Sequence, residues 1–328
     1  MIAESSAPAN IALIKYMGKV DSESNRPTNS SLSWTLEDLR SFVKISSEEN
    51  LTQDQWSPLA GEGLLAIELS EKSIARFLRH FENLKKEFQV PGFFHLQSAN
   101  NFPSDCGLAS SASSFAALTL AAVNLFAKMG NERALECSML ERSQLSRKGS
   151  GSSCRSFFGP FAMWFQEGVR PIEFPMRPLL HQVIVVESQA KAVSSSEAHR
   201  RVITSPLFAG RIERAERRLA DLLENLRHNA EAPKHWRAAY EIIRDEFLDM
   251  HALFETSSEA FSYMTVKTHE VLHYFDHIWK ERNDGPWITM DAGANVHVLY
   301  RGDQFDLALE VENHFKHQLQ IFSNGKLT

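Results

Sequence analysis

Strand-like and helix-like patterns follow one another along this chain without a regular strand–helix–strand rhythm, and this order most constrains its fold. Residues 31–39, 40–48 and 63–71 alternate polar and apolar side chains, which predicts half-buried strands. Residues 71–89 repeat apolar side chains at helical spacing instead, which predicts an amphipathic helix. Such a mixture favours an α+β architecture built in layers.

The remaining elements are predicted from the same periodicities. Strands are expected at residues 92–102 and 181–188, and helices at residues 108–129, 132–146 and 209–228. The arginines and glutamates of the last helix alternate in sign, so we interpret them as a solvated face rather than a phosphate groove. Residues 169–180 contain three prolines, and this segment is our candidate domain boundary. We therefore predict domains at 1–178 and 179–328.

Composition excludes several classes of function. The chain has 328 residues, is 43% hydrophobic and 23% charged, and carries a net charge of -6, so a general nucleic-acid binder is not expected. No secretory signal is visible at the start, and the apolar stretch at residues 115–127 is too short to span a bilayer. Three separated cysteines suggest neither disulfides nor zinc. We expect a cytoplasmic protein with no membrane partner.

The first chemically informative stretch is Asn10 to Lys19, NIALIKYMGK. It begins as an apolar strand and ends with Lys15, Tyr16 and Lys19, which places two ammonium groups at the end of a buried element. Either both lysines simply reach water at the strand's end, or they bind an anion. The stretch alone leaves both readings open.

Two serine-rich stretches could hold phosphates. Residues 101–123 place a turn and small side chains before a helix, whose first turn offers free N–H groups, although the Walker pattern is absent. Residues 148–155 combine Lys148, three serines, two glycines and Arg155. The glycines permit a backbone that points several N–H groups one way, and the guanidinium suits a carboxylate or phosphate. Close helix packing and a flexible polar loop are the alternatives.

The last informative stretch contains Asp291, which precedes a predicted strand at 296–300. An aspartate there is usually a turn-former, but beside anion-binding loops it becomes a candidate base or metal ligand. His269, His273 and His277 share one side of a predicted helix, opposite its apolar side, so we expect them to face water and to bind no metal.

Together these stretches resemble the mevalonate diphosphate decarboxylases of the GHMP kinase superfamily. The matching blocks are NIALIKYMGK, RPTNSSLSWTL, NFPSDCGLASSAS, RKGSGSSCRSFFG, VSSSEAH with SPLF, and MDAGANVHVL, in family order from Asn10 to Leu299. The resemblance implies a GHMP kinase fold, with an N-terminal domain like ribosomal protein S5, a C-terminal ferredoxin-like domain and the active cleft between them. It also implies a homodimer.

The implied reaction is the ATP-dependent decarboxylation of mevalonate 5-diphosphate to isopentenyl diphosphate, with release of ADP, phosphate and carbon dioxide. ATP and Mg²⁺ are the implied cofactors. The resemblance assigns Asp291 to deprotonate the tertiary hydroxyl and Arg155 to bind the substrate carboxylate. It places Lys15 near the reacting hydroxyl and phosphate, where its positive charge would offset developing negative charge. It assigns the following residues to the substrate's phosphates: Tyr16, Lys19, Ser150, Ser152 and Ser195. It assigns the following residues to ATP, with Ser111 also touching Mg²⁺: Gly107, Ser110, Ser111, Ser113, Asn29, Ser30 and Ser31.

The chain also departs from the family pattern. Met17 stands where tryptophan is common, Ala294 where proline is common, and Ser196 where some relatives have arginine. Asp105 and Cys106 replace a pair of alanines beside the phosphate loop, where a carboxylate would repel ATP unless it turns away or engages the metal. None of these changes removes a predicted catalytic group.

Three other functions compete with this interpretation. A GHMP-type kinase would stop after phosphorylating mevalonate or its monophosphate, and such relatives tend to lack the aspartate or the arginine, both of which are present here. A decarboxylase specific for the monophosphate is closer still, and the sequence does not separate it from the diphosphate enzyme. A non-catalytic ligand sensor would be expected to lose Asp291, Lys15 or the serine loops.

Overall fold

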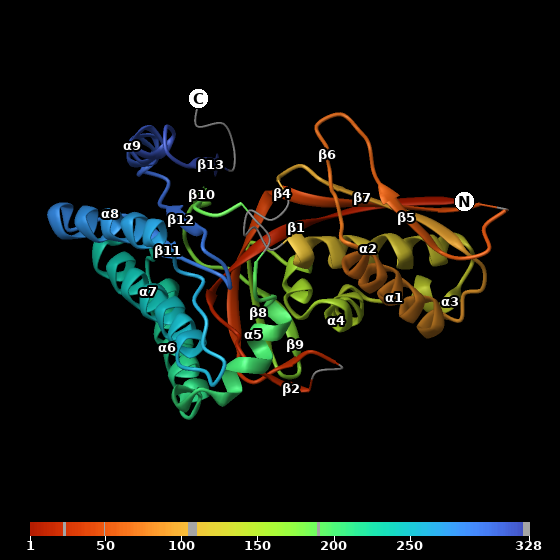
Figure 1. The fold of residues 1–328 in the computed structure, drawn as a ribbon, viewed down its shortest axis with the longest axis horizontal. Helices are drawn as coiled ribbons and strands as arrows, with labels where there is room; N and C mark the ends of the chain where they lie inside the picture. Colours follow the sequence, from red (N-terminus) through yellow and green to blue (C-terminus); the bar gives the residue numbers. More distant parts are fainter. Residues whose placement is uncertain (22–23, 49, 104–109, 189–190, 324–328) are drawn as a thin grey trace.

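Two large β-sheets, each covered by helices, form the computed structural model (Figure 1), and one hydrophobic core contains residues of both sheets. The structure describes residues 1–21, 24–48, 50–103, 110–188 and 191–323. The core joins apolar residues of the first strand, such as Ile11, to residues of the second sheet, such as Val183 and Val298. The two halves of the chain are therefore packed against each other rather than linked loosely.

The larger sheet is organised around one long strand, β4 (Ser31–Ser47). Strand β1 (Ile2–Ile14) pairs antiparallel with β4 along its whole length, from Ile2 opposite Ser46 to Ile14 opposite Leu32. The other strands of this sheet are β5 (Gln55–Pro58), β6 (Leu65–Ala66), β7 (Phe94–Asn100), β8 (Phe161–Phe165) and β9 (Gly168–Ile172). A separate hairpin is formed by β2 (Lys19–Asp21) and β3 (Arg26–Pro27).

Three predicted strands in this region have the wrong bounds. The strands expected at 31–39 and 40–48 form the single strand β4, because a register shift opposite Pro8 and Ala9 absorbs the intervening residues without ending the pairing. In the strand expected at 63–71, only Leu65–Ala66 pairs, at the edge of the sheet with both side chains exposed. Alternation alone does not distinguish a continuous strand from two, nor a paired edge from an exposed loop.

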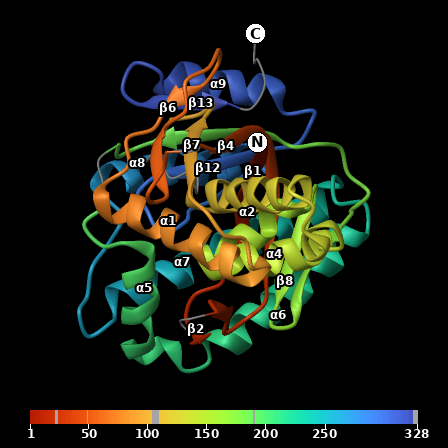
Figure 2. The same ribbon diagram turned by 90° about the vertical axis from the view of Figure 1, so that its right-hand side faces the viewer.

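The helices of the first half lie on one face of the larger sheet, where Figure 2 shows α1, α2 and α4. They are α1 (Glu71–Phe88), α2 (Ser110–Lys128), α3 (Glu132–Leu135) and α4 (Met139–Gly149). Helix α2 is long and apolar enough to cross a membrane, but 67% of its apolar window is buried inside the protein. It packs on β1, β4 and the neighbouring helices as the core helix of this half.

The single helix expected at 132–146 is broken into α3 and α4. Ser138 accepts the backbone N–H of Glu141, and the Glu141 carboxylate accepts the backbone N–H of Ser138 at 2.8 Å. This capping box satisfies the free N–H groups of a new helix, so the chain restarts there instead of continuing. The capping signal was present in the sequence and outweighs the helical periodicity.

The smaller sheet belongs to the second half of the chain. Its strands lie in the order β11 (Trp287–Thr289), β12 (Val296–Tyr300), β10 (Leu180–Val185) and β13 (Gln320–Ser323). The helices of this half are α5 (Ser195–Arg201), α6 (Arg211–Arg227), α7 (Pro233–Glu255), α8 (Val266–Arg282) and α9 (Phe305–Phe315). Short 3₁₀ helices at Gly151–Phe157, Val202–Thr204 and Pro206–Phe208 complete the described elements.

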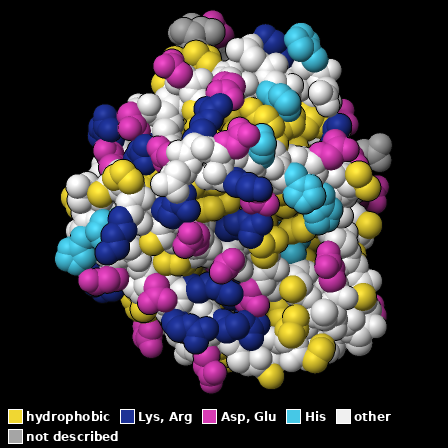
Figure 3. Space-filling model, turned by 90° about the vertical axis from the view of Figure 1, so that its left-hand side faces the viewer, with side chains coloured by type: hydrophobic (Ala, Val, Ile, Leu, Met, Phe, Trp, Pro, Cys, Tyr) yellow, Lys and Arg dark blue, Asp and Glu magenta, His cyan; other side chains and the backbone are white. Residues whose placement is uncertain are grey.

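The interpretation of α6 as a solvated charged face was partly wrong. Figure 3 shows acidic and basic side chains interspersed on the side of the molecule that carries α6 to α8. However, Arg211 is fully buried, and Arg214 and Arg218 also turn inward toward carboxylates of α7. The histidine stripe of α8 is exposed at all three positions, as expected.

Candidate active site

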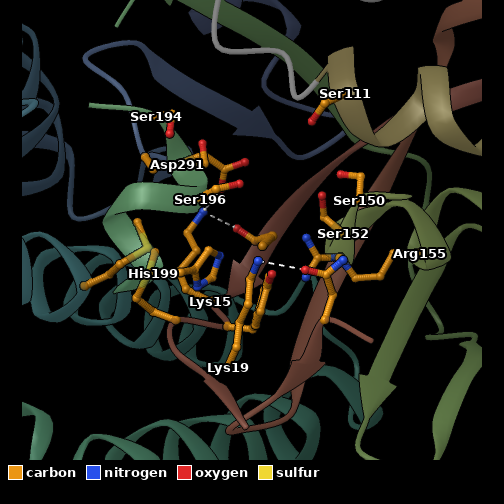
Figure 4. Close-up of a pocket in the computed structure, with 18 of the residues that line it drawn as sticks. Lys15, Lys19, Ser111, Ser150, Ser152, Arg155, Ser194, Ser196, His199 and Asp291 are labelled. Atoms are coloured by element: carbon orange, nitrogen blue, oxygen red, sulfur yellow. Dashed lines mark hydrogen bonds and ion pairs between the residues drawn. The ribbon is translucent and has the colours of Figure 1, made fainter. Parts of the chain in front are cut away.

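A polar cavity of about 270 Å³ lies where the two halves of the chain meet. Figure 4 shows three groups of side chains around it: Ser150, Ser152 and Arg155 on one side, α5 with Ser194, Ser196 and His199 on the other, and Lys15 and Lys19 between them. Asp291, from the turn between β11 and β12, closes the cavity beside α5. Residues from four distant parts of the sequence thus converge.

An ion pair between Lys15 and Asp291 lies in this cavity. Lys15 Nζ is 2.7 Å from Asp291 Oδ1 and donates a second hydrogen bond to the Ala12 carbonyl at 2.7 Å. The Lys15 side chain is 2% exposed and that of Asp291 is 28% exposed, so the carboxylate faces the cavity while the ammonium lies beneath it. One carboxylate oxygen therefore has room to meet a ligand.

Burial and charge shift both pKa values downward. Burial lowers the pKa of Lys15 below its usual 10.5, although the attraction of Asp291 opposes this. Burial alone would raise the pKa of Asp291, but the charges of Lys15, His297 and Arg155 outweigh it and hold that pKa below 3.8. Asp291 is consequently a carboxylate at neutral pH, able to accept a proton only from a group aimed directly at it.

Arg155 points into the cavity from the 3₁₀ helix that follows α4. Its Nε donates to Asn10 Oδ1 at 3.1 Å and its Nη1 donates to Ser31 Oγ at 2.8 Å, and its side chain is buried. These bonds fix the plane of the guanidinium, whose carbon lies 5.8 Å from the Trp164 ring centroid. Burial lowers the pKa of Arg155, but a guanidinium remains charged.

Tyr16 and Lys19 lie at the cavity wall next to α5. The Tyr16 ring is 4.4 Å from the His199 ring, and His199 Nδ1 accepts the backbone N–H of Gly18 at 3.0 Å. Burial raises the pKa of Tyr16, so its hydroxyl stays a hydrogen-bond donor. Lys19 Nζ donates to Asn25 Oδ1 at 2.7 Å and has no carboxylate partner among the described residues.

The glycines of the second serine-rich stretch serve a different purpose from the predicted one. Neither Gly149 nor Gly151 has a positive φ, so neither supplies an unusual backbone conformation. A Cβ on Gly151 would instead overlap the Tyr16 hydroxyl, and one on Gly149 would overlap Phe115 and His80. These glycines allow close approach, which brings Ser150 and Ser152 to the cavity wall.

The structure brings most of the predicted residues together. The predicted residues that line the cavity are Lys15, Tyr16, Lys19, Ser110, Ser111, Ser150, Ser152, Arg155, Ser195 and Asp291. Ser110 and Ser111 also line an adjoining hollow of about 420 Å³ between the first turns of α1 and α2. Gly107, Asp105 and Cys106 lie outside the described residues.

Four predicted ATP-binding residues do not line the cavity. Ser113 is fully buried and hydrogen-bonded to Ser41 at 2.7 Å, because the hydroxyl lies on the packed side of α2. Asn29 donates to the Lys15 carbonyl at 2.9 Å, and the Ser30 backbone N–H donates to Glu216 at 2.6 Å. Ser31 accepts from Arg155. In this structure Asn29 and Ser31 therefore support the cavity residues Lys15 and Arg155 from behind, whereas Ser30 is bonded to α6. The contact of all four residues with ATP stays a prediction.

The sequence reasoning missed several cavity residues. Arg76 of α1, Ser194, His199 and Lys191 line the cavity without having been predicted. Arg76 has the sequence context of any exposed helix arginine, and only the tertiary fold shows that α1 faces the cavity. His199 lies in the quoted VSSSEAH block, so the motif contained a signal that was not assigned a role.

A second, basic hollow of about 490 Å³ adjoins the cavity. Its described lining holds five cations and no carboxylate: Lys19, Arg76, Arg79, Lys148 and Arg200. Lys19 and Arg76 belong to both hollows. In a chain of net charge -6, this local concentration of positive charge favours polyanionic ligands.

Comparison with known proteins decides the family. The family model "Diphosphomevalonate decarboxylase-like N-terminal domain" matches residues 7–170, and the model "Mevalonate 5-diphosphate decarboxylase C-terminal domain" matches residues 182–325. The chain belongs to the diphosphomevalonate decarboxylase family. The identification made from the sequence motifs is thereby confirmed.

Individual relatives agree along nearly the whole chain. A diphosphomevalonate decarboxylase of Candida albicans is 31% identical over 96% of this chain and 89% of its own length. The crystal structure of a mevalonate diphosphate decarboxylase from Legionella pneumophila is 47% identical, with a TM-score of 0.88 over 98% of this chain and 100% of that one. The predicted two-part α+β fold is therefore confirmed.

A further structure shows what one family member binds. The protein MDDEF, solved in complex with MVAPP, AMPPCP and magnesium, is 28% identical and has a TM-score of 0.84 over 98% of this chain and 97% of that chain. A diphosphomevalonate decarboxylase is an ATP-dependent carboxy-lyase, so the family requires a site for two phosphate chains and a carboxylate. The cavity described above has the cations and hydroxyl groups that such ligands need.

Proposed function

We propose that this chain catalyses the ATP-dependent decarboxylation of mevalonate 5-diphosphate to isopentenyl diphosphate, releasing ADP, phosphate and carbon dioxide. The observation that carries the proposal is the Lys15–Asp291 ion pair, 2.7 Å long, in the same cavity as Arg155 and the hydroxyls of Ser150 and Ser152. The family relationship over almost the full chain supports the same reaction.

The first step is phosphoryl transfer to the tertiary hydroxyl. Asp291 accepts the hydroxyl proton as the oxygen attacks the γ-phosphorus of ATP, and the bond between that phosphorus and ADP breaks. Lys15 keeps Asp291 ionised and supplies positive charge close to the transferring phosphoryl group. Because the pKa of Asp291 is low, orientation rather than basicity must supply much of the effect.

The second step removes phosphate and carbon dioxide. The carbon–oxygen bond to phosphate breaks with its electron pair leaving on phosphate, and the bond to the carboxylate carbon supplies the electrons of the new double bond. We assign Arg155 to hold the carboxylate, because its Nε and Nη1 are bound to protein and its plane is thereby fixed. Held in this way, the breaking bonds stay aligned with each other.

The phosphate-binding roles follow from position. We assign Tyr16, Lys19, Ser150, Ser152 and Ser195 to the substrate's phosphates, and Ser110 and Ser111 to those of ATP. The described residues contain no cluster of three or more His, Cys, Asp or Glu that could cage a metal. Mg²⁺ needs no such cluster, because it is commonly held by phosphates, water and one or two protein oxygens. Here the hydroxyl of Ser111 would supply the protein oxygen. When bound, Mg²⁺ neutralises phosphate charge during the transfer.

A parallel product assay tests the function. Purified protein is mixed with MgATP and mevalonate 5-diphosphate, and ADP and carbon dioxide are quantified together, with mevalonate and its monophosphate as comparison substrates. Equal amounts of both products, formed fastest from the diphosphate, are expected. ADP without carbon dioxide would indicate a kinase, faster turnover of the monophosphate would reassign the substrate, and neither product from any substrate would overturn the proposal.

The ion pair predicts how the pH dependence should change in a variant. In Lys15→Gln, Asp291 loses its nearest positive charge but stays in the same cavity, so its pKa should rise. Since Asp291 acts as a carboxylate, the acidic limb of the pH profile of kcat should lie at higher pH in Lys15→Gln than in the wild type. The residual activity of the variant is enough to measure it. A pH–rate profile of both proteins measures this, and an unmoved limb would contradict the coupling.

The basic hollow predicts a dependence on ionic strength. Arg79 lines this hollow but not the cavity, and it forms no ion pair with any described residue. Arg79→Gln should lower kcat/KM for mevalonate 5-diphosphate about twofold to fivefold at low salt, leave kcat unchanged and flatten the salt dependence. Lys72→Gln, an exposed change on the same helix, is the control. Equal salt dependence in all three proteins would argue against steering by the hollow.

Three predictions about organisation complete the proposal. We propose a cytoplasmic location, which the free thiols of Cys137 and Cys154 support. We also propose a homodimer, to be tested by light scattering of the protein as it elutes from a size-exclusion column.

The domain boundary at residue 178 stays a prediction. It is supported by its position between the last strand of the larger sheet, which ends at Ile172, and β10, which begins at Leu180.

A further inference from the structure

Helix α7 lies behind the cavity and contacts both members of the Lys15–Asp291 pair through their backbones. Glu246 Oε1 accepts the backbone N–H of Lys15 at 3.0 Å, and His251 Nε2 is 3.2 Å from the backbone carbonyl oxygen of Asp291. Both α7 side chains are buried, at 0% and 2% exposure. Neither side chain belongs to the described lining of the cavity.

Lys15 depends on side chains for its backbone hydrogen bonds. Strand β1 ends at Ile14, so the next residue has left the ladder with β4. Its N–H is taken by Glu246, and its carbonyl accepts from Arg211 Nη2 at 3.0 Å and Asn29 Nδ2 at 2.9 Å. A buried backbone group without a partner is costly, so these contacts strongly favour one position for Lys15.

Glu246 is itself held rigidly by a buried ionic network. Arg211 and Glu246 form an ion pair in which both side chains are fully buried. Arg218 Nη1 also binds Glu246 at 3.0 Å, and Asp249 shares Arg211, Arg214 and Arg218. Removing one member of such a network leaves a buried charge without its partner, which is far costlier than the net value of the pair. The carboxylate therefore offers the Lys15 N–H a fixed acceptor.

His251 is oriented to donate to the Asp291 carbonyl. A carbonyl oxygen only accepts, so the proton must lie on Nε2, and Nδ1 is left without a hydrogen bond in the described structure. The ring lies 5.3 Å from that of Phe254 and 6.2 Å from that of Tyr263, edge-on to both. Burial lowers the pKa of His251 to about 3, so the ring stays neutral in the working pH range. It can hold the turn but is not expected to deliver a proton.

We propose that α7 sets the distance between the ammonium of Lys15 and the carboxylate of Asp291, with Glu246 and His251 as positioning residues. The two are five residues apart on one helix, about 7.5 Å along its axis. Lys15 and Asp291 are 276 residues apart in sequence, and their backbones are both hydrogen-bonded to this one helix. This inference rests on the proposed function, because it concerns the geometry of that reaction.

The first test removes the hydrogen bond of His251 while keeping its bulk. His251→Phe can still pack against Phe254 and Tyr263 but cannot donate to Asp291, whereas His251→Gln can place an amide N–H near the position of Nε2. We expect His251→Phe to lower kcat about tenfold to a hundredfold, with KM for both substrates changed less than about threefold. His251→Gln should recover most of the loss.

The second test uses the acidic limb of the pH–rate profile. In His251→Phe, Asp291 is expected to move away from Lys15, so its pKa should rise and the limb of kcat should shift to higher pH. A role in folding alone would reduce the active fraction equally at all pH values and leave the limb in place. Active-site titration and the thermal midpoint measure the folded fraction independently.

A matched pair of changes on α7 tests Glu246. Glu246→Gln keeps an oxygen for the Lys15 N–H but loses the charge that holds Arg211, whereas Glu241→Gln makes the same change at an exposed position of the same helix. We expect kcat to fall at least about fivefold in the first and to be unchanged in the second. If His251→Phe does not fold, this pair of variants tests whether α7 positions the ion pair.

The outcomes separate the two proposals. If the wild-type protein forms no carbon dioxide from mevalonate 5-diphosphate, the proposed function fails. If the wild-type protein is active but His251→Phe and Glu246→Gln keep normal kcat and pH profiles, the role of α7 is refuted. The role of α7 would also be refuted if His251→Phe loses kcat, His251→Gln does not restore it, and the acidic limb of the pH–rate profile stays in place. The two His251 variants would then differ from the wild type only in how well they fold.

Discussion

Replacing Asp291 with asparagine should lower kcat about a thousandfold while leaving the dissociation constant of mevalonate 5-diphosphate within about threefold of the wild-type value. The amide keeps the shape of the side chain and can still accept a hydrogen bond from Lys15, which now lies 2.7 Å from Oδ1. It can no longer accept the proton of the tertiary hydroxyl. Steady-state kinetics and calorimetric titration with the substrate measure the two quantities.

The products formed by this variant show in which step Asp291 acts. Because the proton is removed during phosphoryl transfer, ADP and carbon dioxide should fall together in Asp291→Asn. Continued ADP formation without carbon dioxide would place Asp291 in the second step instead. Asp306→Asn, an exposed change in the first turn of α9, should leave both products unchanged. A rate within about fivefold of the wild type in Asp291→Asn would remove this residue from the proposed mechanism.

Most residues named from the sequence line one cavity, whereas the extents of several predicted elements were wrong. Lys15, Arg155 and Asp291 could be named in advance because each lies in a short block of sequence that matches the family pattern. Their convergence in one cavity depends on tertiary packing, which could be inferred from the sequence only through the family resemblance. Arg76 shows the limit: nothing near it in sequence distinguishes it from a surface arginine, yet it lines the cavity.

Charged residues were a further source of error. The sign alternation of α6 predicted a solvated face, but it could not reveal that Glu246 and Asp249 of α7 lie opposite Arg211, Arg214 and Arg218. Such a pairing joins residues about thirty positions apart and leaves no periodic signature in either helix. The supporting layer of the site, including the contacts of α7 with Lys15 and Asp291, was therefore invisible before the structure was known.

Replacing Arg155 with lysine should lower kcat/KM for mevalonate 5-diphosphate about tenfold to a hundredfold, the effect of losing a charge-assisted hydrogen bond worth about 1.5–3 kcal/mol. Two of the three guanidinium nitrogens are already bound, Nε to Asn10 and Nη1 to Ser31, so the plane offered to a ligand is fixed by the protein. An ammonium on a shorter stem cannot keep both bonds and also address a carboxylate. The affinity for ATP should change less than about twofold.

A substrate analogue identifies which group Arg155 contacts. An analogue of mevalonate 5-diphosphate that lacks the carboxylate should inhibit the wild-type protein and Arg155→Lys with nearly equal inhibition constants, because the contact that the variant loses is absent from this ligand. Arg170→Lys, an exposed change on β9, should leave both kinetics and inhibition unaltered. If the analogue is instead weakened as much as the substrate, Arg155 binds a group that both ligands share, and its diphosphate is then the first candidate, since Ser150 and Ser152 line the same wall.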